Sequence, residues 1–215
     1  MELIPVTVCE NRQLGPGFWL SWERNFSFHP GQVVGLTLEP QQAVRWYSLA
    51  SGTQDVWASV LYTEVEGGEL TPSLAKLKPG DKIYITPPQG MFSFPSRYVG
   101  IATGTGIAPF LSAQKSGNLG LVQLYQGSRF LEGLYFHELW ESLLGERYIP
   151  CCSREKNSNI TFNRVTEALR QSSGQLGGPQ TAFRVCGSAE MVVEARDVLI
   201  EKGVPFRQIV SEVYF

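Results

Sequence analysis

The stretch "RWYSLAS", residues 45–51, places a cation, aromatic rings and hydroxyls next to one another. Arg45 can pair with a phosphate, Tyr47 offers a flat face for stacking, and Ser48 can hydrogen-bond a polar ring edge. Together these groups suit a flat ring that carries phosphate, such as a flavin. Because side chains alternate along a strand, Arg45 and Tyr47 would share one face, with Ser48 on the other unless a bulge redirects it.

A glycine-rich turn follows a strand-like run in "YVGIATGTGIAPFL", residues 98–111. Gly104 and Gly106 would let a phosphate approach the backbone, and Pro109 suits the first turn of a following helix. A pyrophosphate is the ligand that this arrangement fits. The third glycine of the G-x-G-x-x-G pattern is missing, so a tight strand–helix connection without a ligand is the alternative.

Hydroxyl and guanidinium side chains gather where the next two strands should end. In dinucleotide-binding folds, a residue about 20 positions beyond the glycine turn contacts the adenosine ribose, as an acid for NAD or a cation for NADP. Here "QGSRF" supplies Ser128 and Arg129, and "CCSREKNSNITFNR" supplies Ser153, Arg154 and Arg164. The three guanidinium groups could converge on a doubly charged phosphate, or each could be a solvated surface residue.

The segment "GGELTPSLAKLKPGD", residues 67–81, has a helix start, with Thr71 as the N-cap and Pro72 at the first helical position. A helix N-terminus attracts anions, so this segment is a second candidate phosphate site. A capped surface helix without a ligand would explain the same residues.

Composition limits the kinds of ligand. The 215 residues include 18 basic and 20 acidic side chains, which offers no electrostatic footprint for nucleic acid or an anionic membrane. No apolar run approaches the roughly 18 residues that span a bilayer, and the first residues do not resemble a signal peptide, so we expect a cytoplasmic protein. The four cysteines form no C-x-x-C pair, and with only His29 and His137 available we expect no protein-held metal.

The pattern of the chain changes near residue 97. Before that point, short segments rich in β-branched and aromatic residues are separated by turns, at residues 3–8, 18–23, 32–38, 44–51, 56–64 and 82–86. Six such strands predict a small antiparallel β-barrel, because closure removes exposed sheet edges.

After residue 97, strand-like stretches alternate with helical ones, which is typical of an α/β domain with a parallel sheet. Five strands are expected, at residues 98–102, 120–126, 147–151, 182–186 and 207–213. The clearest helix spans residues 189–202, where Met191, Ala195 and Leu199 recur on one face and Gly203 supplies the stop.

Seven stretches follow one another in a recognisable order: "FHPGQ" at 28–32, "RWYS" at 45–48, "GELTPSL" at 68–74, "ATGTGIAPFL" at 102–111, "SRE" at 153–155, "CGSAEM" at 186–191 and "EVYF" at 212–215. This order resembles the ferredoxin–NADP reductase family, especially its bacterial type, over nearly the whole chain. The resemblance implies a flavin-binding β-barrel domain over residues 1–97 and an NADP-binding α/β domain with a five-stranded parallel sheet over residues 98–215.

For the flavin, the resemblance implies that Arg45 binds, that Tyr47 packs on the ring, and that Ser48 lies near its N5 atom. The segment that would approach the flavin pyrophosphate contains Gly68, Thr71 and Ser73.

For the nucleotide, the resemblance implies that Thr103, Gly104, Thr105 and Gly106 hold the pyrophosphate and the nicotinamide ribose, and that Arg129, Arg154 and Arg164 hold the 2′-phosphate. Cys186 and Glu212 would line the nicotinamide pocket, although a buried strand end would also explain Cys186. The terminal aromatic residues Tyr214 and Phe215 would cover the flavin, and Phe215 would have to move aside for the nicotinamide.

The activity that this resemblance implies is an NADPH-dependent flavoprotein reductase. Hydride would pass between NADP(H) and bound FAD, and single electrons to or from ferredoxin or flavodoxin. FAD is expected rather than FMN. Two alternatives stay open: a free-flavin reductase or the reductase component of an oxygenase, and a non-catalytic flavin or nucleotide sensor.

Overall fold

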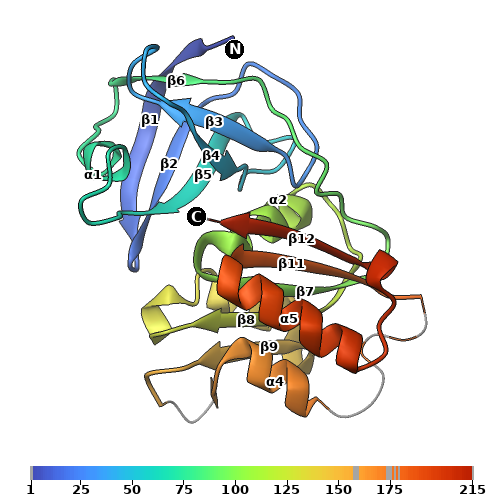
Figure 1. Cartoon of the computed structure of the whole chain (residues 1–215). Helices are drawn as coiled ribbons and strands as arrows, with labels where there is room; N and C mark the ends of the chain where they lie inside the picture. The colour runs from blue at the N-terminus through green and yellow to red at the C-terminus, as the bar shows by residue number, and fades with distance from the viewer. Residues whose placement is uncertain (1, 157–159, 173–175, 177, 179, 215) are drawn as a thin grey trace. The chain divides into compact units, whose positions relative to one another are not determined.

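The computed structural model describes residues 2–156, 160–172, 176, 178 and 180–214. The chain forms two compact units (Figure 1). The first comprises Met1–Ser93 and Ala108–Gly117, and the second comprises Phe94–Ile107 and Asn118–Phe215. Among the described residues, no helix combines the length and the apolar character needed to cross a membrane.

The first unit is a curled sheet of six antiparallel strands in the order β4-β3-β6-β1-β2-β5. The strands are β1 (Ile4–Leu14), β2 (Gly17–Glu23), β3 (Val33–Thr37), β4 (Arg45–Ser48), β5 (Trp57–Thr63) and β6 (Lys82–Ile85). The two edges of the sheet meet just beyond β4, where Leu49 forms a bridge with Val60 and the Ala50 N–H donates to the Ser59 carbonyl at 2.8 Å. The six-stranded antiparallel barrel predicted from the sequence is therefore confirmed.

Strand β1 extends six residues beyond its predicted end at residue 8. Its first part pairs with β6, and after an irregularity between Val8 and Glu10 its second part pairs with β2. The second part, "CENRQL", is mostly polar and has no fully buried side chain, so the apolar alternation that indicates a strand is missing.

The core of the first unit consists of apolar side chains from the strands. Its fully buried members include Leu20, Trp22, Leu36, Val60, Ile83 and Ile85. Leu70 and Leu74, from the segment that contains helix α1 (Thr71–Leu74), join the same cluster. The core therefore holds the short helix against the sheet.

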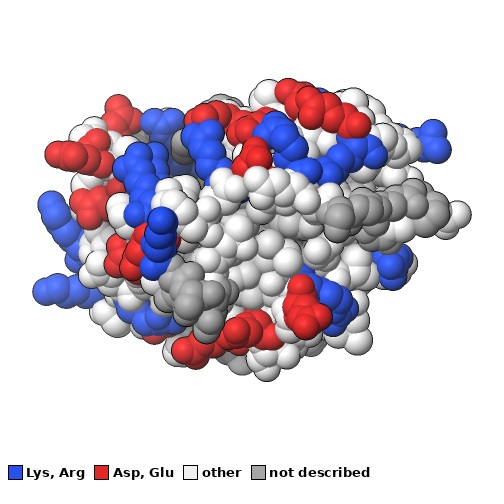
Figure 2. Space-filling model, turned by 90° about the horizontal axis from the view of Figure 1, so that it is seen from below, with Lys and Arg blue, Asp and Glu red and all other residues white. Residues whose placement is uncertain are grey.

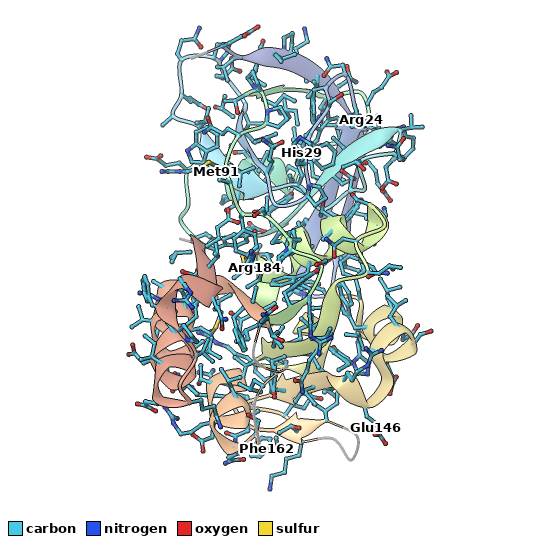
Figure 3. The ribbon with its side chains drawn as sticks, turned by 90° about the vertical axis from the view of Figure 1, so that its right-hand side faces the viewer. Arg24, His29, Met91, Glu146, Phe162 and Arg184 are labelled. Atoms are coloured by element: carbon cyan, nitrogen blue, oxygen red, sulfur yellow. The ribbon has the colours of Figure 1, made fainter. Side chains whose placement is uncertain are left out.

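The second unit contains a parallel sheet in the order β10-β9-β8-β7-β11-β12. The strands are β7 (Tyr98–Thr103), β8 (Leu121–Ser128), β9 (Tyr148–Cys152), β10 (Thr161–Phe162), β11 (Ala182–Ser188) and β12 (Ile209–Tyr214). The prediction of five strands is wrong, because β10 adds a sixth. This edge strand consists of two exposed residues, so no apolar pattern marks it; Phe162 ends it at the outside of the unit (Figure 3).

Helices α4 (Val165–Gln171) and α5 (Ala189–Glu201) lie on the same face of this sheet (Figure 1). Their buried residues share one core cluster with β7, β8, β9 and β11. Helix α3 (His137–Leu144) buries Trp140 and Leu144 outside that cluster. Short 3₁₀ turns complete the unit: η1 (Gly104–Ile107), η2 (Leu131–Gly133), η3 (Gly145–Arg147) and η4 (Phe206–Gln208).

Helix α2 (Ala108–Lys115) belongs to the first unit, although it follows η1 directly in the sequence. The buried Ser112 hydroxyl donates to the Ser51 carbonyl at 2.7 Å, and the Ser116 hydroxyl accepts the Thr53 N–H at 2.9 Å. The Phe110 ring also contacts the Phe92 ring edge-on, with their centroids 6.3 Å apart. The two hydrogen bonds fasten the helix and the residue after it to the segment that follows β4, and the ring contact joins the helix to the segment that follows β6.

Candidate functional site

The six strands of the second unit run parallel, so their carboxyl ends share one edge of the sheet, where α/β folds bind ligands. Most of the residues predicted to bind the nucleotide lie at or just beyond these ends: Thr103, Gly104, Thr105, Gly106, Ser128, Arg129, Ser153, Arg154, Arg164 and Cys186. The topology therefore gathers residues that are widely separated in the sequence.

The glycine-rich turn is the 3₁₀ turn η1, directly after β7. Gly104 has a φ of 53°, a left-handed conformation, and no atom within 4 Å of where a Cβ would stand. Gly106 differs, because a Cβ there would overlap the Cys186 carbonyl on β11. The open side of Gly104 suits a ligand, whereas the missing side chain of Gly106 lets two backbone segments of the protein approach each other.

Cys186 is fully buried near the end of β11, opposite Ala102 of β7 and Glu212 of β12. Burial raises the pKa of its thiol well above the ordinary value, the Glu212 charge raises it further, and a hydrogen bond with Tyr214 opposes the shift. The thiol therefore stays protonated and neutral, which suits a packing role better than proton transfer.

Arg129 and Arg154 are brought together by hydrogen bonds between their backbones. The Arg154 N–H donates to the Arg129 carbonyl at 2.9 Å, and the Ser153 N–H donates to the Ser128 carbonyl at 3.0 Å. Both arginine residues are exposed. Two guanidinium groups thus extend from adjacent, parallel segments at the edge of the sheet.

Arg164 behaves differently from these two arginines. It is the N-cap residue of α4, and its guanidinium pairs with two carboxylates of α5, Glu190 at 3.2 Å and Glu194 at 3.7 Å. Sequence reasoning missed these carboxylates, although Glu190 lies within the "CGSAEM" motif.

Of the terminal aromatic residues, Tyr214 is half-buried, and Phe215 lies outside the described residues.

In the first unit, the "RWYS" motif forms the whole of β4. Arg45 is exposed and pairs with Glu69 at 3.4 Å, while Ser48 is buried and lies opposite Val33 of β3. Tyr47 is half-buried, and burial raises its pKa to about 12 against the opposing effect of the Arg45 charge. The Tyr47 hydroxyl therefore keeps its proton at neutral pH.

The segment with Gly68, Thr71 and Ser73 differs from its prediction in one respect. Leu70 is the N-cap residue of α1, not Thr71, and it provides no side-chain cap. The Thr71 hydroxyl instead accepts the Val65 N–H at 2.8 Å and closes the preceding turn. The predicted capping is therefore wrong, because Thr71 is the first residue of the helix and its hydroxyl accepts an N–H of the preceding turn. Ser73 is exposed.

Asn11 connects the two predicted flavin-binding segments, and sequence reasoning missed it. Its amide nitrogen donates to the carbonyls of Leu74 and Leu77, at 2.8 and 3.0 Å, at and beyond the end of α1. Its amide oxygen accepts the Tyr62 hydroxyl at 3.1 Å. The Tyr62 ring in turn meets the Tyr47 ring edge-on, with their centroids 6.3 Å apart.

Arg184 is a second residue that the sequence reasoning did not consider. It lies on β11 and is 7 % exposed (Figure 3). Burial lowers its pKa, partly offset by Tyr98, and its guanidinium donates to the Phe183 carbonyl at 3.1 Å. In the sequence, an arginine within the apolar run "AFRVCG" was the signal that could have identified this buried residue.

Within the described part of the chain, no three His, Cys, Asp or Glu side chains form a possible metal site.

Replacing Asn11 with alanine should lower the free energy of unfolding by about 1–3 kcal/mol, because two carbonyls lose their side-chain donor. The matched control is Gln13→Ala, which removes an exposed amide from the same strand and should change stability by less than about 0.5 kcal/mol. Urea denaturation measures both. Equal effects of the two substitutions would contradict the linking role of Asn11.

The Gly106→Ala variant should lose about 1–3 kcal/mol of stability, because the added methyl group would force η1 away from the Cys186 carbonyl. Thr105→Ala, on the same turn, is the control and should stay within about 0.5 kcal/mol of the parent protein. Thermal or urea unfolding distinguishes them. A Gly106→Ala protein of unchanged stability would rule out the close approach.

Alkylation of the folded protein with iodoacetamide at about pH 8, near the ordinary thiol pKa, should modify Cys9 and spare the other three cysteines. Cys9 is partly exposed, whereas Cys151, Cys152 and Cys186 are buried. Burial also raises the pKa of Cys151, to about 12, and that of Cys186. Peptide mapping by mass spectrometry identifies the modified sites, and fast alkylation of Cys186 would refute its assignment as a neutral buried thiol.

Comparison with known proteins places these features in a family. The family described as "Oxidoreductase NAD-binding domain" matches residues 101–197. Ferredoxin–NADP reductase B of Sorangium cellulosum is 30 % identical over 220 residues, which cover 91 % of this chain and 90 % of that protein. Phenol hydroxylase P5 protein of Acinetobacter pittii is 29 % identical over 96 % of this chain, which spans 64 % of the length of that protein.

The fold has a close counterpart among solved structures. A ferredoxin NADP⁺ reductase from Neisseria gonorrhoeae, solved with bound FAD and NADP, aligns over the full length of both chains with a TM-score of 0.88 and 24 % sequence identity. This likeness shows the two-unit fold, and the identity to the Sorangium protein over nearly all of both sequences shows the kinship. The chain belongs to the ferredoxin–NADP reductase family.

Proposed function

We propose that this protein is an NADPH-dependent flavoprotein reductase, which passes hydride between NADP(H) and bound FAD and single electrons to or from a ferredoxin-type partner. One observation carries the proposal: the glycine-rich turn, the arginine pair and Cys186 lie at the same carboxyl edge of one parallel sheet. The names of the relatives support it, since several are ferredoxin–NADP reductases.

The residues at that edge fit the nucleotide. The left-handed, unobstructed backbone at Gly104 can accept a phosphate, with Thr103, Thr105 and Gly106 completing the turn. Arg129 and Arg154 extend from adjacent segments, with Ser128 and Ser153 beside them, and guanidinium groups suit the 2′-phosphate of NADP. Arg164 would be the third cation of this set once it leaves its carboxylate partners.

The first unit fits the flavin. Tyr47 offers a half-buried ring that keeps its hydroxyl proton, Ser48 follows it on β4, and Arg45 remains exposed for a phosphate. The turn with Gly68, Thr71 and Ser73 would face the pyrophosphate, as in the family motif. We accordingly assign FAD to the first unit and NADP to the second.

Once bound, the flavin supplies the redox chemistry, exchanging hydride with the nicotinamide and single electrons with a protein partner. The protein's own residues would position the nicotinamide and cover the flavin. The neutral Cys186 thiol would line the nicotinamide site without taking a proton, because hydride transfer to flavin needs no protein base. Glu212, next to Cys186 in the sheet, would provide the nearby charge, and Tyr214 and Phe215 would cover the flavin.

Two partner classes fit the family, ferredoxin or flavodoxin on one hand and an oxygenase component on the other. The similarity to phenol hydroxylase P5 protein favours the second class as an alternative function. Both functions share the same cofactor chemistry, so the first experiment addresses that chemistry and leaves the partner to a second one.

Anaerobic titration of the purified protein with NADPH, and separately with NADH, tests the proposal. We expect a yellow protein whose flavin absorbance bleaches at a lower concentration of NADPH than of NADH, because two or three arginines would favour the 2′-phosphate. Absorbance spectra record the bleaching. A colourless protein, or a bound flavin that neither nucleotide reduces, would refute the reductase function.

A further inference from the structure

The guanidinium of Arg164 is paired with two carboxylates of α5. The Arg164 Nη2 atom lies 3.2 Å from the Glu190 Oε1 atom, and Nη1 lies 3.7 Å from the Glu194 Oε2 atom. The Arg164 and Glu190 side chains are 61 % and 75 % exposed, so a ligand can reach both. The family motif assigns Arg164 to a phosphate, but in this structure its guanidinium pairs with two carboxylates of the protein.

The backbone makes this pairing possible. Arg164 immediately precedes α4, and Glu190 lies in the first turn of α5, which packs beside α4 in the same core cluster. Glu194 follows one turn later on the same side of α5, where it also approaches Arg170 at 3.8 Å. Among the described residues, Glu190 forms an ion pair with Arg164 alone.

The two carboxylates therefore differ in the ion pairs that each would keep if a competing anion bound Arg164. Glu194 would keep Arg170 as a partner, and Arg170 is also paired with Glu167 at 2.8 Å. Glu190 would be left without a counter-charge. Its negative charge would then lie close to any anion that Arg164 binds.

We propose that Glu190 is a specificity-determining residue, which competes with the 2′-phosphate of NADP(H) for Arg164 and so limits the preference for NADP(H) over NAD(H). The inference rests on the nucleotide site proposed above. A 2′-phosphate monoester carries close to two negative charges at neutral pH, so it both draws Arg164 away and is repelled by the freed carboxylate. NAD(H) has no 2′-phosphate and meets neither cost.

The size of the effect follows from the exposure of the pair. Exposed ion pairs contribute little, which corresponds to about a two- to fivefold change in an equilibrium constant. Salt screens charges on an open surface, so the effect should shrink as ionic strength rises. We therefore expect a modest change in selectivity rather than a reversal of it.

Isothermal titration calorimetry of the oxidised holoprotein with NADP⁺ and with NAD⁺ tests the inference at low ionic strength. Replacing Glu190 with glutamine, which keeps the shape and removes the charge, should increase the ratio of the NAD⁺ to the NADP⁺ dissociation constant by about two- to fivefold. The gain should come from tighter NADP⁺ binding, with NAD⁺ binding unchanged. At about 0.5 M salt most of the gain should be lost.

Two further variants make the assignment specific. In an Arg164→Ala background, Glu190→Gln should increase the ratio by less than it does in the parent protein, because the contested guanidinium is gone and only the repulsion between carboxylate and phosphate remains. Glu167→Gln is the matched control, since it removes a carboxylate of α4 that pairs with Arg170 rather than Arg164, and it should leave the ratio near that of the parent protein.

The possible results distinguish a failure of this inference from a failure of the proposed function. A Glu190→Gln protein with an unchanged or smaller ratio would overturn the inference while leaving the reductase function in place. An equal increase with Glu167→Gln, or an increase that is as large without Arg164 as with it, would also overturn it, because competition for Arg164 would then not explain the change. A parent protein that binds neither nucleotide would refute the proposed function itself.

Discussion

The close approach of the backbone at Gly106 to the carbonyl of Cys186 is the constraint on which the nucleotide edge depends. It fixes the glycine-rich turn after β7 against the end of β11. Gly187 of β11 allows a second close approach, because a Cβ at this residue would overlap the Thr103 hydroxyl at the end of β7. Two missing side chains thus leave room for the turn η1 and the Thr103 side chain to lie against the end of β11.

Burial then determines which groups near the proposed cofactors carry charge. Tyr47 and Cys186 both have raised pKa values, because a low-dielectric surrounding disfavours their anions. The arginines at the strand ends are exposed instead. On the face drawn in Figure 2, basic and acidic side chains alternate around an uncharged area. Opposite charges also pair locally, as Arg164 does with Glu190.

The sequence predicted the antiparallel barrel and the α/β unit because their strands carry regular apolar patterns and their turns carry glycine or proline. It failed where the pattern carries no such signal. The second part of β1 is polar because it pairs at the surface, and β10 is too short for any periodicity. The capping role expected of Thr71 was lost to a backbone donor six residues earlier, which no spacing rule foresees.

At the candidate site, residue types were predictable and their partners were not. Glycine and arginine at strand ends indicate phosphate binding by type alone, but only the fold shows that Gly106 faces β11 and that Arg164 faces α5. Asn11 escaped notice because its function depends on segments more than sixty residues away. Contacts over such distances in sequence arise from packing, which local composition does not encode.

Helix α2 gives the first unit a discontinuous sequence. Its serine hydroxyls bond the segment after β4, and Phe110 packs on Phe92, yet the chain reaches this helix only after it has formed the first strand of the second unit. During synthesis, the barrel must therefore wait for residues 108–117 before its last contacts can form. A fragment cut near residue 97 would leave the Ser51 carbonyl and the Phe92 ring without these partners, so the units are separable in space but not by a single cut in the chain.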